Sequence, residues 1–332
     1  GLKMDLLDRA YGALVGGAIG DAMGMPASFL TREQIKNTYG YIKDFLKPDD
    51  DVQKYHGSLE AGDITDDTME SIIVSKVLIE HNGFSEEAFN NEMKKWAIEQ
   101  KMLESTVIGP STRRYLTALI EGRDPKETSG KGNTNGSAMR AAPIGVKYYN
   151  DIAKCIEAAV ASSLPSHGSK PAVAAACAVA AAVSGGVHGG YSPNEILNMA
   201  YDAALYGEKK GADITAPMVS KRIKLIESIV DSVGEGSIND ILDEIAGVFG
   251  ASMFAYESVP VALAIFYAVN GNAKEGILGA VNTGDDADTN GSICGNICGA
   301  YSGASGLPDE WKERVQKTSS VDFKAEAQKL IG

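Results

Sequence analysis

Basic residues are scarce in this chain. Its 332 residues include 31 lysines and arginines against 44 acidic side chains, which gives a formal net charge of −13. No run of basic residues interrupts this acidic excess, so the chain lacks the positive surface that binds nucleic acid or an anionic membrane. We therefore expect small molecules or cations as its ligands, and neither nucleic acid nor a membrane as its partner.

Cysteines are also few. Only Cys155, Cys177, Cys294 and Cys298 occur, all in apolar or glycine-rich segments. They are too few for a disulfide framework in a chain of this length, so we expect a reducing, cytoplasmic location. Cys294 and Cys298 share one helix face, but no nearby histidine or second cysteine pair accompanies them, and packing explains them better than metal binding. The N-terminal segment lacks the basic and apolar regions of a signal peptide.

Alternating apolar and polar runs, which are typical of β-strands, are hard to find. Apolar residues recur instead at three- and four-residue spacing, the period of an amphipathic helix. Such helical segments cover residues 66–81, 86–101, 151–164, 195–206, 218–233 and 256–269, and loops are expected at 40–65, 122–136, 207–216 and 270–273. No linker divides the chain, so the sequence predicts one all-α domain over residues 1–332.

Two segments rich in small residues predict close helix packing. Residues 172–183 contain eight alanines, and no charged residue occurs from Pro171 to Asn194. Alanine contributes little to membrane insertion, so we expect a buried central helix and not a membrane span. Glycines also recur every four residues at positions 12, 16, 20 and 24. No strand precedes them, which excludes a dinucleotide-binding loop and favours a bare packing face on the first helix.

Two acidic segments each lead into a predicted helix. The first is GDITDDTM, in which Thr65 can cap the helix and Asp66 and Asp67 favour its positive end. The second is NTGDDADTNGS at residues 282–292, whose first half resembles an EF-hand calcium loop. The glutamate that completes such a loop is absent, so an ordinary EF-hand is not expected. Taken alone, the first motif is explained by helix capping.

Together the two segments supply the ligands of a hard divalent cation. Four carboxylates and two hydroxyls come from Thr65, Asp66, Asp67, Asp286, Asp288 and Thr289. Oxygen ligands of this kind suit Mg²⁺ or Mn²⁺, and several carboxylates are needed to offset the charge of two cations. If the loops converge, the carboxylates repel one another unless a cation lies between them. The residue types therefore favour a site for two Mg²⁺ or Mn²⁺ ions.

Five separated motifs resemble those of one enzyme family. They are GALVGGAIGDAMGMP at 12–26, GDITDDTM at 62–69, NGSAMRAAPIGV at 135–146, SHGSKPAVAAACAVAAAV at 166–183 and NTGDDADTNGSICGNICGAYSG at 282–303. In these motifs the sequence is similar to the ADP-ribosylglycohydrolase family, which includes the enzymes that remove ADP-ribose from dinitrogenase reductase. The resemblance spans most of the chain in the family's order. It implies a compact, orthogonal multi-helix domain with two magnesium or manganese ions in a central cleft.

The resemblance also implies roles for individual residues. It makes metal ligands of the six acidic-loop residues named above. It implies an ADP-ribose pocket that contains Asn135, Gly136, Ser137, Met139 and His167, and a phosphate-binding helix N-terminus that contains Gly109, Ser111 and Thr112. His167 also fits a packing role at a helix start, and Arg140 fits a structural ion pair better than catalysis.

Three departures from the family pattern affect the expected chemistry. Many family members have a glutamate where this chain has Ser28, and the nitrogenase-regulating relatives have an acid where it has Val107. Asp285 stands where the family usually has glycine and adds a carboxylate beside the metal ligands. Two carboxylates expected to transfer protons are thus missing, and one new carboxylate is present.

The sequence therefore predicts a metal-dependent hydrolase that cleaves a glycosidic bond at the anomeric carbon of an ADP-ribose-like substrate. Asp66 or Asp286 would orient or deprotonate the attacking water, and Asp285 would substitute for the missing acid. Two alternatives are a hydrolase of a smaller nucleoside or ribosyl glycoside and a non-catalytic protein that binds ADP-ribose.

Overall fold

The structure, a computed structural model, describes residues 2–332, with side chains described from residue 5 onward. No strand occurs among these residues, and their only extended pairings are three isolated bridges. The predicted all-α class is confirmed. The helices are α1 Leu2–Gly24, η1 Met25–Ala27, α2 Arg32–Tyr39, α3 Asp66–His81, α4 Glu86–Glu99, η2 Met102–Glu104, α5 Pro110–Ile120, α6 Lys126–Ser129, α7 Gly136–Met139, α8 Ala142–Lys147, α9 Ile152–Ser163, α10 Lys170–His188, α11 Pro193–Lys210, α12 Val219–Val233, α13 Ile238–Phe249, α14 Ala255–Ala268, α15 Ala273–Thr283, α16 Ala287–Ser302, η3 Ala304–Gly306, α17 Asp309–Ser319 and α18 Phe323–Ile331.

The helices expected from apolar periodicity are all present, and two of the expected loops are partly helical. The segment predicted at 66–81 coincides with α3. The loop predicted at 207–216 is wrong at its start, because α11 continues to Lys210. Lys209 and Lys210 occupy its last turn, where positive charge stabilises the negative end of a helix. The short helix α6 interrupts the loop predicted at 122–136.

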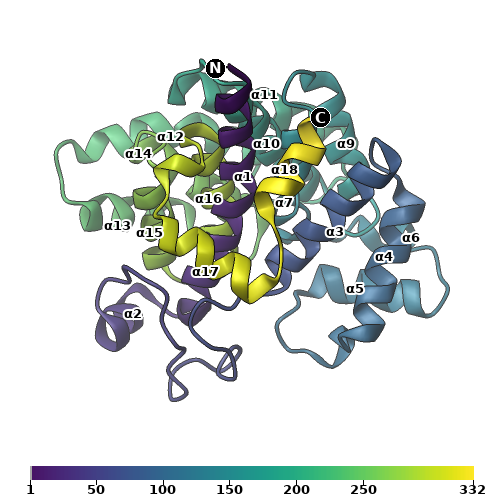
Figure 1. The fold of residues 1–332 in the computed structure, drawn as a ribbon, viewed down its shortest axis with the longest axis horizontal. Helices are drawn as coiled ribbons and strands as arrows, with labels where there is room; N and C mark the ends of the chain where they lie inside the picture. Colours follow the sequence, from purple (N-terminus) through teal and green to yellow (C-terminus); the bar gives the residue numbers. More distant parts are fainter. Residues whose placement is uncertain (1) are drawn as a thin grey trace.

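Helices α1 and α16 form the most extensive helix contact among the described residues, and α1 runs through the middle of the molecule (Figure 1). The glycine stripe of α1 lies against the backbone of α16. A methyl group added at Gly16 would collide with the carbonyl oxygen of Gly295, and one added at Gly20 would collide with that of Gly291. The predicted packing face is confirmed, and its partner is a second row of glycines on an antiparallel helix.

Helix α10 is the one helix among residues 2–332 that is long and apolar enough to cross a membrane. Within its most apolar window, 94% of the residues are buried inside the protein. The helix contacts α9, α11, α8 and α16, and its alanines are buried, so small side chains allow several helices to approach it closely. This confirms the prediction of a buried central helix.

The ends of three helices position the candidate site. The two acidic motifs lie at the N-termini of α3 and α16, and the last turns of α1 lie beside both. Because α1 and α16 are antiparallel, the C-terminal end of α1 meets the N-terminal end of α16.

Candidate metal and substrate site

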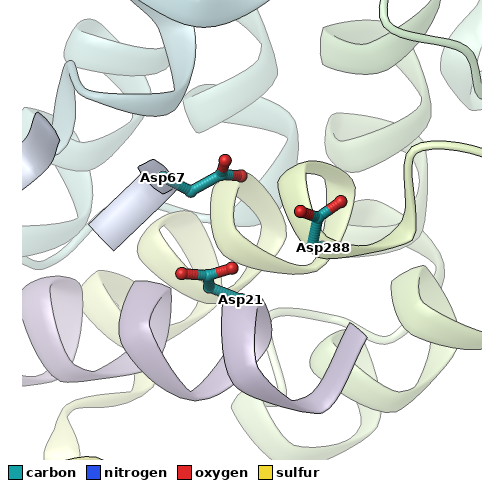
Figure 2. A group of neighbouring side chains, drawn as sticks. All are labelled: Asp21, Asp67 and Asp288. Carbon is teal, nitrogen blue, oxygen red and sulfur yellow. The ribbon is translucent and has the colours of Figure 1, made fainter. Parts of the chain in front are cut away.

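Three buried carboxylates gather where α1, α3 and α16 meet. One carboxylate oxygen from each of Asp21, Asp67 and Asp288 lies within 4.8 Å of the other two. Figure 2 shows the three side chains around a common space. The two acidic loops that the sequence places more than 200 residues apart therefore converge, as the metal-site hypothesis requires.

The chemistry of this cluster fits a divalent cation. Asp67 Oδ2 and Asp288 Oδ1 are buried and accept no hydrogen bond from the protein. A buried acceptor without a partner is costly, and a buried carboxylate is normally paired or coordinated to a metal. Both oxygens belong to residues that the sequence analysis proposed as ligands. The donor set is entirely oxygen, which suits Mg²⁺ or Mn²⁺.

Asp21 fixes the first acidic loop to α1. Its carboxylate accepts hydrogen bonds from the hydroxyl and backbone amide of Thr65 and from the Thr68 hydroxyl, at 2.7, 2.8 and 2.6 Å. Thr65 also caps α3 by accepting a hydrogen bond from the Asp67 amide. The capping role and a role in positioning ligands are therefore combined in one residue.

Crowding of carboxylates shifts their acidity. Burial first, and then the negative charge of neighbouring acids, raises the pKa of Asp66, Asp67 and Asp286 well above the usual value. The same two causes raise the pKa of Asp21 to about 6. Burial alone would raise the pKa of Asp288 also, but the neighbouring His56 lowers it below the usual range. Without cations the cluster therefore holds protons that bound metal ions would displace.

A cavity of about 240 Å³ opens beside the carboxylates. Ten of the predicted site residues line it: Asp66, Asp67, Gly109, Thr112, Asn135, Gly136, Met139, Asp286, Asp288 and Thr289. Residues expected to bind cations thus lie in the same cavity as residues expected to bind substrate.

Four predicted residues lie behind this lining. The Ser137 hydroxyl is buried and hydrogen bonds the Ser163 hydroxyl at 2.8 Å. The His167 ring is buried beneath Gly136, where a methyl group would collide with its Nε2. Burial first, and then nearby arginines, lowers the pKa of His167 well below its usual value, so the ring is neutral. Thr65 and Ser111 are also buried outside the lining.

Asp285 has no place in the cavity. It is exposed, does not line the cavity, and its backbone pairs with Leu30. Its φ of 53° is the left-handed conformation, which the glycine usual at this position in the family adopts without strain. The structure therefore gives no support to the expectation that Asp285 replaces the missing acid, because a proton donor must reach the reacting atoms.

Asn135 connects the substrate side of the cavity to the second acidic loop. Its side-chain amide donates hydrogen bonds to Asp286 Oδ2 at 2.7 Å and to the Ser258 hydroxyl at 3.1 Å. Its backbone amide donates to the carbonyl of Met253 at 2.9 Å. The residue therefore positions a carboxylate as well as lining the cavity.

Sequence reasoning missed several residues at this site, and four of them bear on its chemistry. Asp21 lies within the first family motif and directly follows a stripe glycine, which is the one signal that marks it. His56 lines the cavity, and its Nε2 lies 3.7 Å from Asp288 Oδ2. Phe29 and Tyr55 also line it. Tyr55 and His56 come from a loop that carries no recognisable pattern, whereas Phe29 directly follows Ser28, the position at which the chain departs from the family pattern.

Arg140 forms the buried ion pair that the sequence analysis favoured. Its Nη1 lies 3.1 Å from Glu70 Oε1, and both side chains are fully buried. Arg140 also donates to Ser166 at 2.8 Å and lies 4.7 Å from the centre of the Phe89 ring. This pair joins α3, which begins with the first acidic motif, to the residue that follows α7. It therefore helps to hold these two elements of the site together.

The comparisons with known proteins agree with this geometry. A family model described as ADP-ribosylglycohydrolase matches residues 2–331. The chain belongs to the ADP-ribosylglycohydrolase family. It is 28% identical to the uncharacterized protein YegU of Escherichia coli, over 95% of this chain and 94% of that one. It is also 26% identical to the ADP-ribosylarginine hydrolase Tri1 of Pseudomonas putida, over 93% of this chain and 74% of that one.

A solved structure shares the fold of this glycohydrolase. It is titled ADP-ribosylglycohydrolase-related protein complex and matches with a TM-score of 0.73 and 23% identity, over 98% of each chain. Family membership makes the protein an enzyme of the glycosidase class. Within this class its departures are local: Ser28 is buried near Asp288, whose pKa it helps to lower, and Val107 lines the cavity.

Proposed function

We propose that this glycohydrolase uses divalent cations to hydrolyse the bond at the anomeric carbon of an ADP-ribosyl substrate. One observation carries the proposal: two acidic loops distant in sequence converge, and buried oxygens of Asp67 and Asp288 accept no hydrogen bond from the protein. Such oxygens are satisfied by a cation. Mg²⁺ or Mn²⁺ would be held by Thr65, Asp66, Asp67, Asp286, Asp288 and Thr289, with Asp21 beside them.

Different residues of the cavity would have different roles in the reaction. Bound cations supply positive charge that polarises water and the ribose hydroxyls. Asp66 is the partly exposed acid of the set and lines the cavity, and its raised pKa suits a group that accepts a proton from water. Asn135 holds Asp286 in place through its amide.

The N-terminus of α5 faces the same cavity. Gly109 and Thr112 line it, and no side chain caps the first amides of this helix. Free amides at a helix N-terminus bind phosphate oxygens. The diphosphate of an ADP-ribosyl substrate would therefore lie against α5, with its ribose toward the acidic loops.

A smaller ribosyl compound is a second candidate substrate. Ser28 replaces a glutamate of many family members near the carboxylates, so recognition or protonation of the leaving group differs from theirs. Hydrolysis of such a compound would use the same metal site and the same attack at the anomeric carbon. Only the group attached to that carbon would differ from that of an ADP-ribosyl substrate.

Calorimetry and a hydrolysis assay test the proposal. We expect the protein to bind Mg²⁺ or Mn²⁺, to bind ADP-ribose more tightly with the metal present, and to release ribose or ADP-ribose from at least one glycoside. Asp288→Asn should weaken metal binding and abolish turnover, whereas Asp213→Asn, at a side chain 88% exposed, should do neither. Absence of metal binding would refute the proposal. Tight binding of metal and ADP-ribose without hydrolysis of any glycoside would indicate a binding protein.

A further inference from the structure

Two aromatic rings stand at the mouth of the cavity. The rings of Phe29 and Tyr55 lie 4.7 Å apart between centres, at an angle of 57°, and both side chains line the cavity. Tyr55 remains 45% exposed, which is unusual for a large apolar ring in this protein. Exposed aromatic surface beside a polar cavity is available to a ligand.

The backbone of Phe29 is strained. Its φ is 64°, a left-handed conformation that is a genuine outlier for a bulky residue. Two contacts hold it there: its amide donates to the carbonyl oxygen of Asp285, and the next residue, Leu30, pairs with Asp285 in an antiparallel bridge. Glycine would adopt this conformation without cost, so the strain is explained if the ring itself is needed.

Tyr55 is also held in place. Gln53 accepts a hydrogen bond from the Tyr55 amide at 3.0 Å. The buried side chain of Gln53 donates to the carbonyl oxygens of Pro26 and Ser28, at 3.0 Å each. The segment that carries Tyr55 is therefore bound to the segment that carries Phe29, and the two rings form a pre-organised surface.

This surface lies next to the expected reaction centre. His56 follows Tyr55 and lies 3.7 Å from Asp288. Asp285, whose carbonyl oxygen holds Phe29, directly precedes Asp286. The rings thus border the carboxylates that would hold the cations, where the group attached to the anomeric carbon would lie.

We propose that Phe29 and Tyr55 form a stacking platform for a planar nitrogen heterocycle that is the leaving group of the substrate. The inference rests on the proposed function in its second form, in which the substrate is a smaller ribosyl compound. In the reaction the oxygen of water bonds to the anomeric carbon, and the bond from that carbon to the ring nitrogen breaks. The electron pair of that bond leaves with the heterocycle. A base that departs from a neutral glycoside, such as hypoxanthine, takes up one proton of the water, whereas nicotinamide departs from a cationic glycoside as the neutral base and that proton passes to solvent. The products are a free ribosyl hemiacetal and the neutral base.

The acids of the cavity favour this leaving group over a guanidinium or an alcohol. Among the described residues, the carboxylates that line the cavity are Asp66, Asp67, Asp286 and Asp288, and all four belong to the proposed metal set. None is left to pair with a guanidinium or to protonate an alkoxide. A heterocycle delocalises the departing electron pair and needs less help from an acid, and its flat face stacks on aromatic rings.

Kinetics and binding with matched variants test the platform. Phe29→Gly keeps the left-handed turn and removes a ring, Tyr55→Ala removes the other, Tyr55→Phe keeps it, and Tyr191→Ala removes an aromatic ring outside the cavity. We expect the wild-type enzyme to prefer nicotinamide riboside or inosine over ADP-ribosyl-arginine and ADP-ribosyl-serine. Phe29→Gly and Tyr55→Ala should lower kcat/KM for the base ribosides by about tenfold, and the other two variants should not.

Binding of separate fragments distinguishes the outcomes. In the presence of Mg²⁺, free nicotinamide or hypoxanthine should bind the wild-type protein about tenfold more tightly than Phe29→Gly, while ADP-ribose, which has no leaving group, should bind both equally. If Phe29→Gly lowered the affinity for ADP-ribose as much as the affinity for the free bases, the proposal would be overturned. The rings would then bind the adenine of ADP-ribose. Failure of either free base to bind would also overturn it. Failure to bind Mg²⁺ would instead refute the proposed function.

Discussion

The carboxylate of Asp21 accepts a hydrogen bond from the Thr65 hydroxyl at 2.7 Å and another from its amide at 2.8 Å. This contact joins the end of α1 to the start of α3, between which η1, α2 and a long loop intervene. It fixes the backbone from which Asp66 and Asp67 project. The position of one acidic loop thus depends on a residue of another helix.

Asp21→Asn should therefore weaken metal binding. An amide cannot accept all the hydrogen bonds that the carboxylate accepts from Thr65 and Thr68, so the first loop loses its fixed orientation. Groups that orient metal ligands typically change affinity by about 10- to 100-fold when they are removed. Calorimetric titration with Mn²⁺ measures this change, with the exposed Asp213→Asn as control. An unchanged affinity in Asp21→Asn would contradict the role of this contact.

Asp67→Asn should have opposite effects on the metal-free and metal-bound protein. The substitution removes a buried carboxyl group whose ionisation is opposed by burial and then by the charge of Asp288, which raise its pKa. We expect a higher Tm without metal, because less repulsion remains, and a smaller rise of Tm on adding Mg²⁺. Thermal denaturation in chelator and in excess Mg²⁺ measures both. A lower Tm in chelator would show that repulsion among these carboxylates is not the dominant effect.

The stability of the metal-free protein should fall as pH rises. The pKa of Asp21 is raised from 3.8 to about 6, and the pKa values of Asp66, Asp67 and Asp286 are raised also. The folded protein therefore binds more protons than the unfolded chain between these values, so the free energy of unfolding decreases through that range. In chelator we expect Tm to fall as pH rises from about 4 to about 6, the range that Asp21 sets, and saturating Mg²⁺ should abolish this fall. A Tm in chelator that rises over this range would contradict the assigned shifts.

Gly16→Ala should destabilise the protein although it lies outside the cavity. The added methyl group would collide with the backbone of Gly295 and force α1 and α16 apart. Overpacking of this kind costs about 1–3 kcal/mol or more. Gly247→Ala is the matched control, because a methyl group there meets no atom within 4 Å and alanine favours a helix by about 1 kcal/mol. Chemical denaturation should show opposite signs for the two variants, and equal effects would contradict the close contact.

Local patterns in the sequence account for much of the fold and part of the site. The apolar period of residues 66–81 specifies α3 to its last residue, because one face of that helix is buried. The acidic motifs identify Asp67 and Asp288 as candidate ligands, and the structure places both in one buried carboxylate cluster, as hard cations require clustered oxygen atoms. The glycine stripe predicts that one face of α1 packs closely against another helix.

Contacts between distant segments account for what the sequence could not show. The partner of the glycine stripe is α16, about 280 residues away, and no local pattern pairs the two. His56 comes from a loop without periodicity, and its place beside Asp288 depends on how that loop folds back. Ser137 and His167 occur in recognisable motifs, yet neither lines the cavity. Ser137 lies on the single turn of α7, which directs only part of its residues toward the cavity. His167 precedes α10, and its ring lies beneath Gly136.

The glycine contact between α1 and α16 has a consequence for mutational tolerance. Gly12 lies nine residues before Asp21, about 13 Å along the helix, and meets Gly299 across the contact. Any side chain added at a glycine of this contact changes the spacing of α1 and α16, the helices that carry Asp21 and Asp288. A saturation map of the chain should therefore show a stripe of intolerant positions that runs from the cavity to the opposite end of α1, far from any atom that touches substrate.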